Sequence, residues 1–298
     1  FSLLHTKTFN LLRENRPDVT WDKIQKFELF VEKFSRDYKT KEETLFRFDT
    51  FMSNVEIIDK LNKNSTGVTY AVNDFADWTE DEYNKILSTT VQKPALKGVR
   101  LEESIHAADL PTVVDWRMGN HVTDIKYQGI CGACWAFSTV AAIESAWSIN
   151  KGELKNLSPQ QVLDCTPGSE KCGGGYMDGA LDWIIDNGGV TSLHDEPYEF
   201  VSRDCESDKP IAASIRNYTS AVTNFANNEN RFYHSGISDN AECGTEQTHA
   251  LIIIGYGDGY WLLKNSYGTL WGEKGYMRVR RGVNWCGIVT DPAYLPIV

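Results

Sequence analysis

The chain has 298 residues, of which 41% are hydrophobic and 12% aromatic, so it can bury a sizeable core. Its formal net charge is -11 and no run of five like charges occurs, which argues against nucleic acid or an anionic membrane as partner. The longest apolar run, residues 250–254, is too short to cross a bilayer. We therefore expect a globular monomer.

Two helices are predicted near the N-terminus. Hydrophobic side chains recur at helical spacing over residues 20–38 and predict one buried stripe that begins after a Thr20 cap. Its members are Trp21, Ile24, Phe27, Phe30, Val31, Phe34 and Tyr38. A second helix is predicted over residues 41–62, which contain neither Gly nor Pro, and Glu43 and Arg47 are spaced to pair along it.

Residues 89 to about 110 contain Pro, Gly and mixed charge without periodicity, which predicts an exposed connection. All seven cysteines follow it. The small and apolar residues 133–149 predict a buried helix, and glycines bound predicted strands at 249–257, 259–266 and 275–281. Helices first and strands later indicate an α+β protein.

Two cysteines three residues apart, Cys131 and Cys134, suggest a reactive thiol. The thiolate is the nucleophilic form, and a helix N-terminus or a histidine partner favours it. Cys134 starts the predicted helix, whereas Cys131 lies one loop earlier and suits a disulfide. The alternative is a redox or zinc C-x-x-C pair, but no βαβ unit surrounds it and no second pair exists. We therefore expect no metal and no cofactor.

Of six histidines, only His249 leads into a predicted buried strand, where an imidazole can be held facing a cleft. Asn265 follows sixteen residues later and is suited to accept the second imidazole N–H and fix the ring. A histidine before a strand is also often structural. The pair therefore points to catalysis only in combination with Cys134.

The odd number of cysteines predicts three disulfides and one free thiol in an oxidising compartment. Sequons at Asn64, Asn156 and Asn217 are compatible with a glycoprotein on the secretory route. These features favour a lysosomal or secreted protein.

Together these segments resemble the papain-like cysteine peptidases over nearly the whole chain. "QGICGACW" from 128, "THALIIIGYG" from 248 and "KNSYGTLWGEKGY" from 264 are similar to the family's nucleophile, histidine and asparagine segments, in the family's order. "CGGGYMDGALDW" from 172 is closest to the cathepsin L-like branch, and "AVNDFAD" from 71 resembles the second propeptide motif, with Ala71 where glycine is usual. The helical signature of the inhibitory propeptides is matched by Glu43, Arg47, Phe51, Asn54, Ile58 and Asn62.

The resemblance implies a proenzyme with an inhibitory propeptide over residues 1–108 and a two-lobed peptidase, one lobe helical and one a β barrel, over 109–298. Peptide and protein substrates are implied, and so is inhibition by the enzyme's own propeptide. In the implied acyl transfer, a Cys134 thiolate paired with a His249 imidazolium attacks the peptide carbonyl. Asn265 orients the ring, and the Gln128 side chain with the Cys134 N–H holds the oxyanion.

Further roles are implied by family position. The disulfides are Cys131 with Cys172, Cys165 with Cys205, and Cys243 with Cys286, which leaves Cys134 free. The substrate-binding residues are Gly174 and Gly175 as a backbone ledge, Tyr176 and Met177 as apolar walls, Ala250 beside the histidine, and Asp291 on the pocket floor. A bulky hydrophobic side chain is the expected substrate group, and Asp291 would additionally accept Lys or Arg.

The chain also departs from the family. His249 and Asn265 follow Cys134 by 115 and 131 residues, against roughly 130–150 in the family, so about 20 residues and one apolar β-lobe strand are expected to be absent between Cys205 and Cys243. Tyr267 replaces a tryptophan and Thr248 an acidic or polar residue. The second hypothesis is therefore a truncated or inactive homologue that acts only as a binding or decoy protein.

Overall fold

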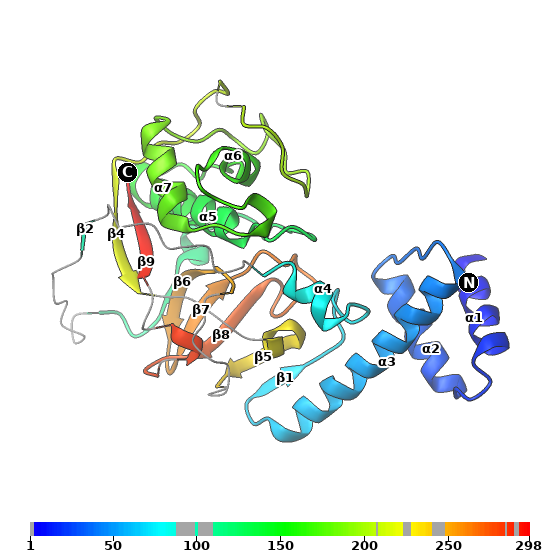
Figure 1. Cartoon of the computed structure of the whole chain (residues 1–298). Helices are drawn as coiled ribbons and strands as arrows, with labels where there is room; N and C mark the ends of the chain where they lie inside the picture. The colour runs from blue at the N-terminus through cyan, green and yellow to red at the C-terminus, as the bar shows by residue number, and fades with distance from the viewer. Residues whose placement is uncertain are drawn as a thin grey trace.

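The chain folds into a helical N-terminal part beside two packed lobes (Figure 1). The computed structural model describes residues 3–87, 99–100, 110–206, 208–222, 228–239, 248–283, 285–288 and 292–298. Within these residues, no helix has both the length and the hydropathy that a membrane span needs.

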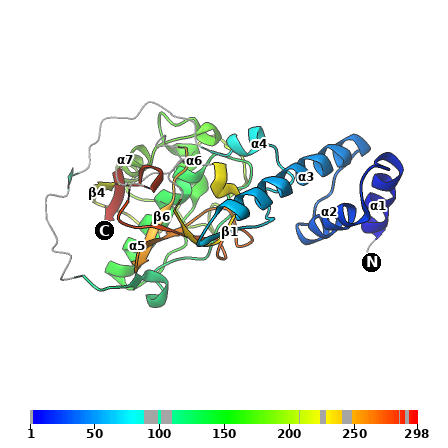
Figure 2. The ribbon, with the colours of Figure 1, turned by 90° about the horizontal axis from the view of Figure 1, so that it is seen from below.

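The N-terminal part, residues 3–87, begins with three helices, α1 (Leu3–Asn15), α2 (Trp21–Lys33) and α3 (Lys41–Asn64). The sequence patterns missed α1. Figure 2 shows α3 leading from the α1–α2 pair towards the lobes. Four aromatic rings of α2 and α3 pack against one another in the centre of the core of this part, namely Phe27, Phe30, Phe48 and Phe51. The two predicted helices are confirmed.

The predicted stripe of α2 is wrong at its ends. Trp21 is 56% exposed, because it lies in the first turn, beyond the core. Thr20 occupies the N-cap position but makes no capping hydrogen bond. At the other end, Ser35 has a φ of 52° and terminates the helix, so Tyr38 lies outside it. The Tyr38 ring nevertheless stacks on Phe27 at 5.9 Å between centroids.

Arg47 does not pair with Glu43, which corrects the sequence-based expectation. Its guanidinium forms a two-pronged ion pair with Glu82, at 2.6 and 2.7 Å, and the Glu43 carboxylate instead accepts the N–H of Lys39. Glu82 lies in α4 (Glu80–Asn84), where it also completes a capping box with Thr79. The ion pair therefore ties α3 to α4.

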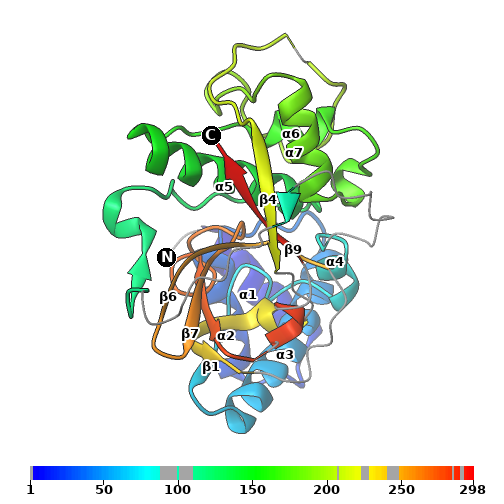
Figure 3. The ribbon, with the colours of Figure 1, turned by 90° about the vertical axis from the view of Figure 1, so that its left-hand side faces the viewer.

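The helical lobe is built on α5 (Cys134–Lys151), α6 (Pro159–Cys165) and α7 (Met177–Asp186). The predicted helix at 133–149 is confirmed by α5, whose core-forming residues include Trp135, Val140 and Ile143. A three-stranded sheet of β2 (Val99–Arg100), β4 (Asn217–Val222) and β9 (Pro292–Ile297) adjoins this lobe. Figure 3 shows β4 and β9 side by side. The strand β2 falls in the segment expected to be an irregular connection.

The β lobe contains a six-stranded sheet in the order β1-β5-β8-β7-β6-β3. Its strands are β1 (Val68–Tyr70), β3 (Val114–Asp115), β5 (Tyr233–Ser238), β6 (Ile252–Gly257), β7 (Tyr260–Lys264) and β8 (Tyr276–Arg280). The three predicted strands are confirmed by β6, β7 and β8. Short 3-10 helices complete the fold: η2 (Trp116–Gly119), η3 (Lys171–Gly173), η4 (Asn228–Phe232) and η5 (Trp285–Gly287).

The N-terminal part is joined to the β lobe through both backbone and core. Strand β1 pairs antiparallel with β5 and so extends the sheet by one edge strand. Phe75, Tyr83 and Ile86 enter the hydrophobic core around Trp271 and Met277 of the β lobe. The missing strand is expected between Cys205 and Cys243, a stretch of which residues 207, 223–227 and 240–243 lie outside the described residues, so that expectation stays a prediction.

Candidate active site

Cys134 is the first residue of α5, a position that favours an anion because helix N–H groups point towards it. It is fully buried and, among the cysteines that the structure describes, is the one that forms no disulfide. The loop before it is fixed by the Cys131–Cys172 disulfide and by a 2.9 Å hydrogen bond from the Gly132 N–H to the Cys172 carbonyl. A Cβ at Gly132 would lie 2.5 Å from that carbonyl oxygen, so only glycine fits.

His249 and Asn265 form a hydrogen-bonded pair, with Nε2 2.9 Å from Oδ1. His249 stands just before β6, and Asn265 just after β7. These strands are antiparallel with Ile252 opposite Lys264, so the sheet register brings the two side chains together. The amide oxygen can only accept, so Nε2 carries a proton and Nδ1 is left to exchange one with a nucleophile.

Tyr267 covers this pair. Its ring lies 4.7 Å from that of His249 between centroids, with 22° between planes, and its hydroxyl is 3.4 Å from Nδ1. Burial raises the pKa of Tyr267 well above its ordinary value, with further contributions from Tyr83 and Cys134, so the phenol stays neutral. The tyrosine ring shields the pair and adds a hydroxyl that tryptophan lacks.

Gln128 joins the two lobes at the site. Its backbone N–H donates to the Ser266 carbonyl at 2.8 Å, and its Oε1 accepts the Ser266 hydroxyl at 2.6 Å. Its Nε2 donates to the carbonyls of Cys131 at 2.9 Å and Ile86 at 3.1 Å. A carbonyl of the N-terminal part thus occupies the amide that is expected to hold the oxyanion.

The expected substrate-binding residues lie beside this site, except Asp291, which is outside the described residues. Gly174 has a φ of 135°, and its N–H and C=O are hydrogen-bonded within the turn to Lys171 and Glu170. At Gly175 a Cβ would meet the Trp135 ring at 2.6 Å. Tyr176 precedes α7, and Ala250 is buried next to His249. A hollow of about 180 Å³ is lined by residues that include Met177, Leu181, Ile253 and Tyr294.

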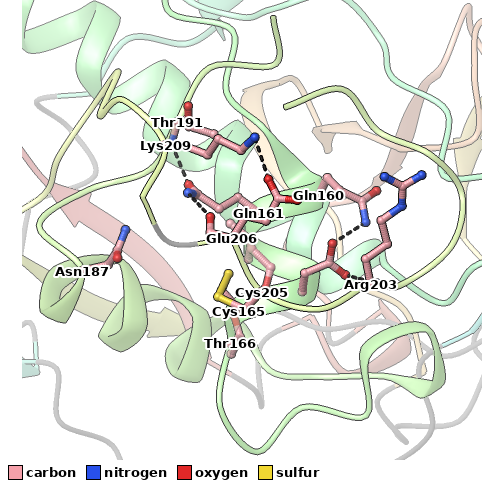
Figure 4. Close-up of a disulfide and its surroundings, with 12 residues drawn as sticks. Gln160, Gln161, Cys165, Thr166, Asn187, Thr191, Arg203, Cys205, Glu206 and Lys209 are labelled. Carbon is pink, nitrogen blue, oxygen red and sulfur yellow. Dashed lines mark hydrogen bonds and ion pairs between the residues drawn. A yellow bond between two sulfur atoms is a disulfide. The ribbon is translucent and has the colours of Figure 1, made fainter. Parts of the chain in front are cut away.

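Disulfides stabilise the loops around the site, and two of them have the pairing that the resemblance implies: Cys131 with Cys172, and Cys165 with Cys205. Figure 4 shows the second, which ties α6 to the segment that contains Arg203. Beside it, Asp164 accepts hydrogen bonds from Gln160 at 2.7 Å and from the Arg203 N–H at 2.6 Å.

Cys286 is also disulfide-bonded, and its expected partner Cys243 lies outside the described residues. The alternative of a C-x-x-C metal or redox pair is wrong, because Cys131 bonds to Cys172 and not to Cys134. No group of three potential metal ligands gathers anywhere in the described ranges.

A buried ion network behind the site was missed by the sequence reasoning. The Glu144 carboxylate of α5 is inaccessible to solvent and accepts from Lys126 at 2.7 Å, Thr123 at 2.5 Å and the Leu157 N–H at 2.8 Å. Lys264, directly before Asn265, donates to Thr123 from the β lobe. The only sequence signal is a lysine in an otherwise apolar strand. The network fixes the strand end that carries Asn265.

Comparison with protein families gives two matches. Residues 110–230 and 209–296 match the papain family cysteine protease, and residues 27–83 match the cathepsin propeptide inhibitor domain (I29). The two protease matches overlap at residues 209–230.

Individual relatives agree with the family matches. Papain of Carica papaya is 35% identical, with 96% of this chain and 91% of papain covered. Digestive cysteine proteinase 1 of Homarus americanus is 34% identical, with 90% and 93% covered. Among solved structures, digestive procathepsin L2 from the larval midgut of Tenebrio molitor superimposes with a TM-score of 0.86 at 30% identity, covering 93% of this chain and 100% of that one. Recombinant stem bromelain precursor gives 0.84 at 34% identity, covering 93% and 99%.

Proposed function

Because the chain belongs to the papain family of cysteine proteases and carries a cathepsin propeptide inhibitor domain, we propose that Cys134 and His249 are its catalytic pair. The observation that carries this proposal is the hydrogen-bonded His249–Asn265 pair, covered by Tyr267, in the part of the fold where Cys134, which forms no disulfide, begins α5.

In the proposed mechanism, His249 Nδ1 holds the proton of Cys134, and the thiolate attacks the substrate carbonyl carbon to form a tetrahedral intermediate. The oxyanion is held by Gln128 Nε2 and the Cys134 N–H. The imidazolium then protonates the leaving amine as the C–N bond breaks. Water, deprotonated by the same imidazole, hydrolyses the thioester and restores the thiol. Asn265 keeps the ring in one orientation throughout.

Residues 1–108 are proposed as the propeptide and 109–298 as the mature protease. Three contacts of the N-terminal part support this division: its strand β1 on β5, its Tyr83 hydroxyl 3.3 Å from that of Tyr267, and the Ile86 carbonyl on Gln128. Since the Ile86 carbonyl occupies the Gln128 amide, a substrate can reach this amide only after the N-terminal part leaves.

Substrates with a bulky apolar side chain are proposed to bind in the hollow beside Met177, whose other walls include Leu181 and Tyr294. The backbone of Gly174 is already engaged, so Gly175 is the better candidate to pair with an extended peptide. Asp291 is proposed on the floor of the same pocket from its position in the sequence alone.

A lysosomal or secreted location is proposed, because two disulfides together with a bonded Cys286 suit an oxidising compartment. Two of the sequon asparagines, Asn64 and Asn156, are exposed and accessible to glycosylation.

Hydrolysis of a fluorogenic peptide with Leu or Phe two residues before the cleaved bond tests the proposed function. After acid maturation, we expect hydrolysis that a thiol-directed epoxide abolishes. If the propeptide is removed, the product is folded and no peptide is hydrolysed, the protease assignment is wrong and a decoy function is favoured.

The Arg47–Glu82 pair predicts that the N-terminal part loosens in acid. Burial alone raises the pKa of Glu82, but hydrogen bonds from Arg47 and Thr79 outweigh it and lower the pKa below the ordinary value of 4.5. A lowered folded-state pKa stabilises the fold above that value, and the stability is lost as pH falls through the folded pKa. Buried Asp77, whose pKa burial raises, acts in the opposite direction and offsets part of the loss.

The measurement is the thermal midpoint of the full chain between pH 7 and pH 3.5, in a Cys134→Ala background that prevents self-cleavage. At pH 7, Glu82→Gln should be less stable than its parent by about 1–3 kcal/mol and should therefore unfold at a lower temperature. On acidification, its thermal midpoint should fall by less than that of its parent. Parallel pH curves for Glu82→Gln and its parent would contradict this prediction.

A further inference from the structure

The loop of residues 74–78 presents five successive backbone carbonyls, and each accepts a hydrogen bond from a side chain. The pairs are Arg36 with Asp74, Arg231 with Phe75, Asn54 with Ala76, Arg47 with Asp77, and both Asn54 and Arg231 with Trp78. Three of the four donor residues belong to the N-terminal part itself. The fourth, Arg231, comes from η4 of the protease part and thus crosses the interface.

Arg231 is buried, with 4% of its surface exposed; among the described residues no carboxylate forms an ion pair with it, although Glu80, Asp77 and Glu82 attract its charge from a greater distance. One nitrogen, Nη2, donates to the Phe75 carbonyl at 2.7 Å and also to the Trp78 carbonyl. The guanidinium lies 4.6 Å from the ring centroid of Phe232 and 5.5 Å from that of Tyr83. Burial lowers the pKa of Arg231 to about 10, so it stays charged at neutral and acidic pH.

A buried cation that no carboxylate contacts is costly unless other acceptors replace its lost water. Here the acceptors are the two carbonyls of the docked loop, assisted by the two ring faces. The cost is therefore offset only when the loop docks with these carbonyls turned towards η4. An apolar side chain at this place would favour any apolar contact, whereas Arg231 favours one backbone geometry.

The backbone of η4 is held in place by the protease part. The indole N–H of Trp271, in the β-lobe core, donates to the carbonyls of Asn230 at 3.1 Å and Arg231 at 3.2 Å. The same Arg231 carbonyl accepts a 2.6 Å hydrogen bond from the Asn73 side chain. The N-terminal part and the protease part thus each bind backbone carbonyls of the other, and Trp271 holds the η4 backbone at which they meet.

We propose that Arg231 is the residue by which the protease part recognises its own propeptide, as a clamp on the carbonyls of Phe75 and Trp78. The inference rests on the proposed function. The clamped loop leads through α4 to Ile86, whose carbonyl occupies Gln128, so release of the loop uncovers the site. Lysine cannot replace the clamp fully, because its compact ammonium lacks the planar face that arginine places over the rings of Phe232 and Tyr83.

The test is the rate at which an epoxide probe labels Cys134 in the full-length proenzyme at pH 7. Arg231→Met is expected to raise that rate at least about 10-fold, and Arg231→Lys by a smaller factor, because loss of a desolvated donor weakens docking. The matched control is Arg280→Met, which removes an arginine of which 41% of the side chain is exposed, ion-paired with Asp239 on the surface. It should leave the rate unchanged.

After acid maturation, kcat/KM of every variant should lie within about twofold of wild type, because Arg231 touches none of the catalytic residues. An Arg231→Met proenzyme that labels as slowly as wild type and matures to an active enzyme would overturn the proposal. If this variant does not fold, Arg231→Lys decides by the same criterion.

Failure of the proposed function is a separate outcome, in which the mature wild type is not labelled at Cys134. The thermal midpoint of the full chain then decides on Arg231. It should fall in Arg231→Met and not in Arg280→Met, and equal midpoints would refute the clamp.

Discussion

Replacement of Cys134 with alanine is expected to lower kcat/KM for a peptide substrate on the order of 10⁴-fold or more, because it removes the nucleophile itself. Alanine favours a helix, and the buried side chain at the start of α5 is small, so the fold should persist. Initial rates on a fluorogenic peptide measure the first effect, and the thermal midpoint measures the second. Epoxide labelling, mapped by mass spectrometry, should disappear in the same variant.

The matched control is a double variant, Cys131→Ala with Cys172→Ala, which removes the neighbouring disulfide without leaving a lone thiol. The Cys131–Cys172 disulfide spans a sequence separation of 41 residues, so its loss should cost roughly 4 kcal/mol of stability in the chain-entropy model. Labelling of Cys134 should survive in whatever fraction remains folded. A label mapped to any other residue in the wild type would contradict the assignment of Cys134.

The elements that the sequence predicted are those with a strong local pattern. Helix α5 follows from a dense run of small and apolar residues, and strands β6, β7 and β8 from apolar runs bounded by glycines. Periodicity does not show at which residue a helix ends, or which of its turns extend beyond the hydrophobic core. Trp21 fits the stripe of α2 but lies in an exposed first turn, and Ser35 ends the helix before Tyr38.

Contacts between distant segments could not be read from spacing. Glu43 lies four residues before Arg47, yet the Arg47 guanidinium pairs with both carboxylate oxygens of Glu82 in α4. Likewise nothing local in Val68–Tyr70 shows that this strand extends the sheet of the β lobe by pairing with β5. Tertiary geometry decides such choices, and a single sequence does not contain it explicitly.

The candidate site shows the same division. The motifs and their family order placed Cys134, His249 and Asn265, and the structure brings the last two within 2.9 Å. The groups that cover the site come from elsewhere. Ile86 reaches Gln128 through its backbone carbonyl, and a carbonyl carries no sequence signal.

Replacement of Glu144 with alanine is expected to lower the free energy of unfolding by about 3–5 kcal/mol, a large share of a typical total of ~5–15. The carboxylate is inaccessible to solvent and holds Lys126 and Thr123, and Thr123 in turn accepts from Lys264. Without it, the two ammonium groups are left near each other with no anion between them. Thermal unfolding in a Cys134→Ala background should show a midpoint about 10 °C lower.

Two comparisons distinguish this network from an ordinary ion pair. Glu153→Ala removes the surface pair with Lys155, in which the glutamate side chain is 64% exposed, and should cost less than about 1 kcal/mol.

The second comparison is the dependence of stability on pH. Burial lowers the pKa of Lys264 to about 8 although Glu144 counteracts it, while the unfolded lysine titrates near ~10.4. Between these values the unfolded state binds more protons, so stability rises with pH. Because Glu144→Ala removes the counteracting charge, its rise should begin at lower pH and be larger than that of its parent. A deficit that stays constant or grows between pH 7 and pH 10 would contradict the role of Glu144 as the counter-ion of Lys264.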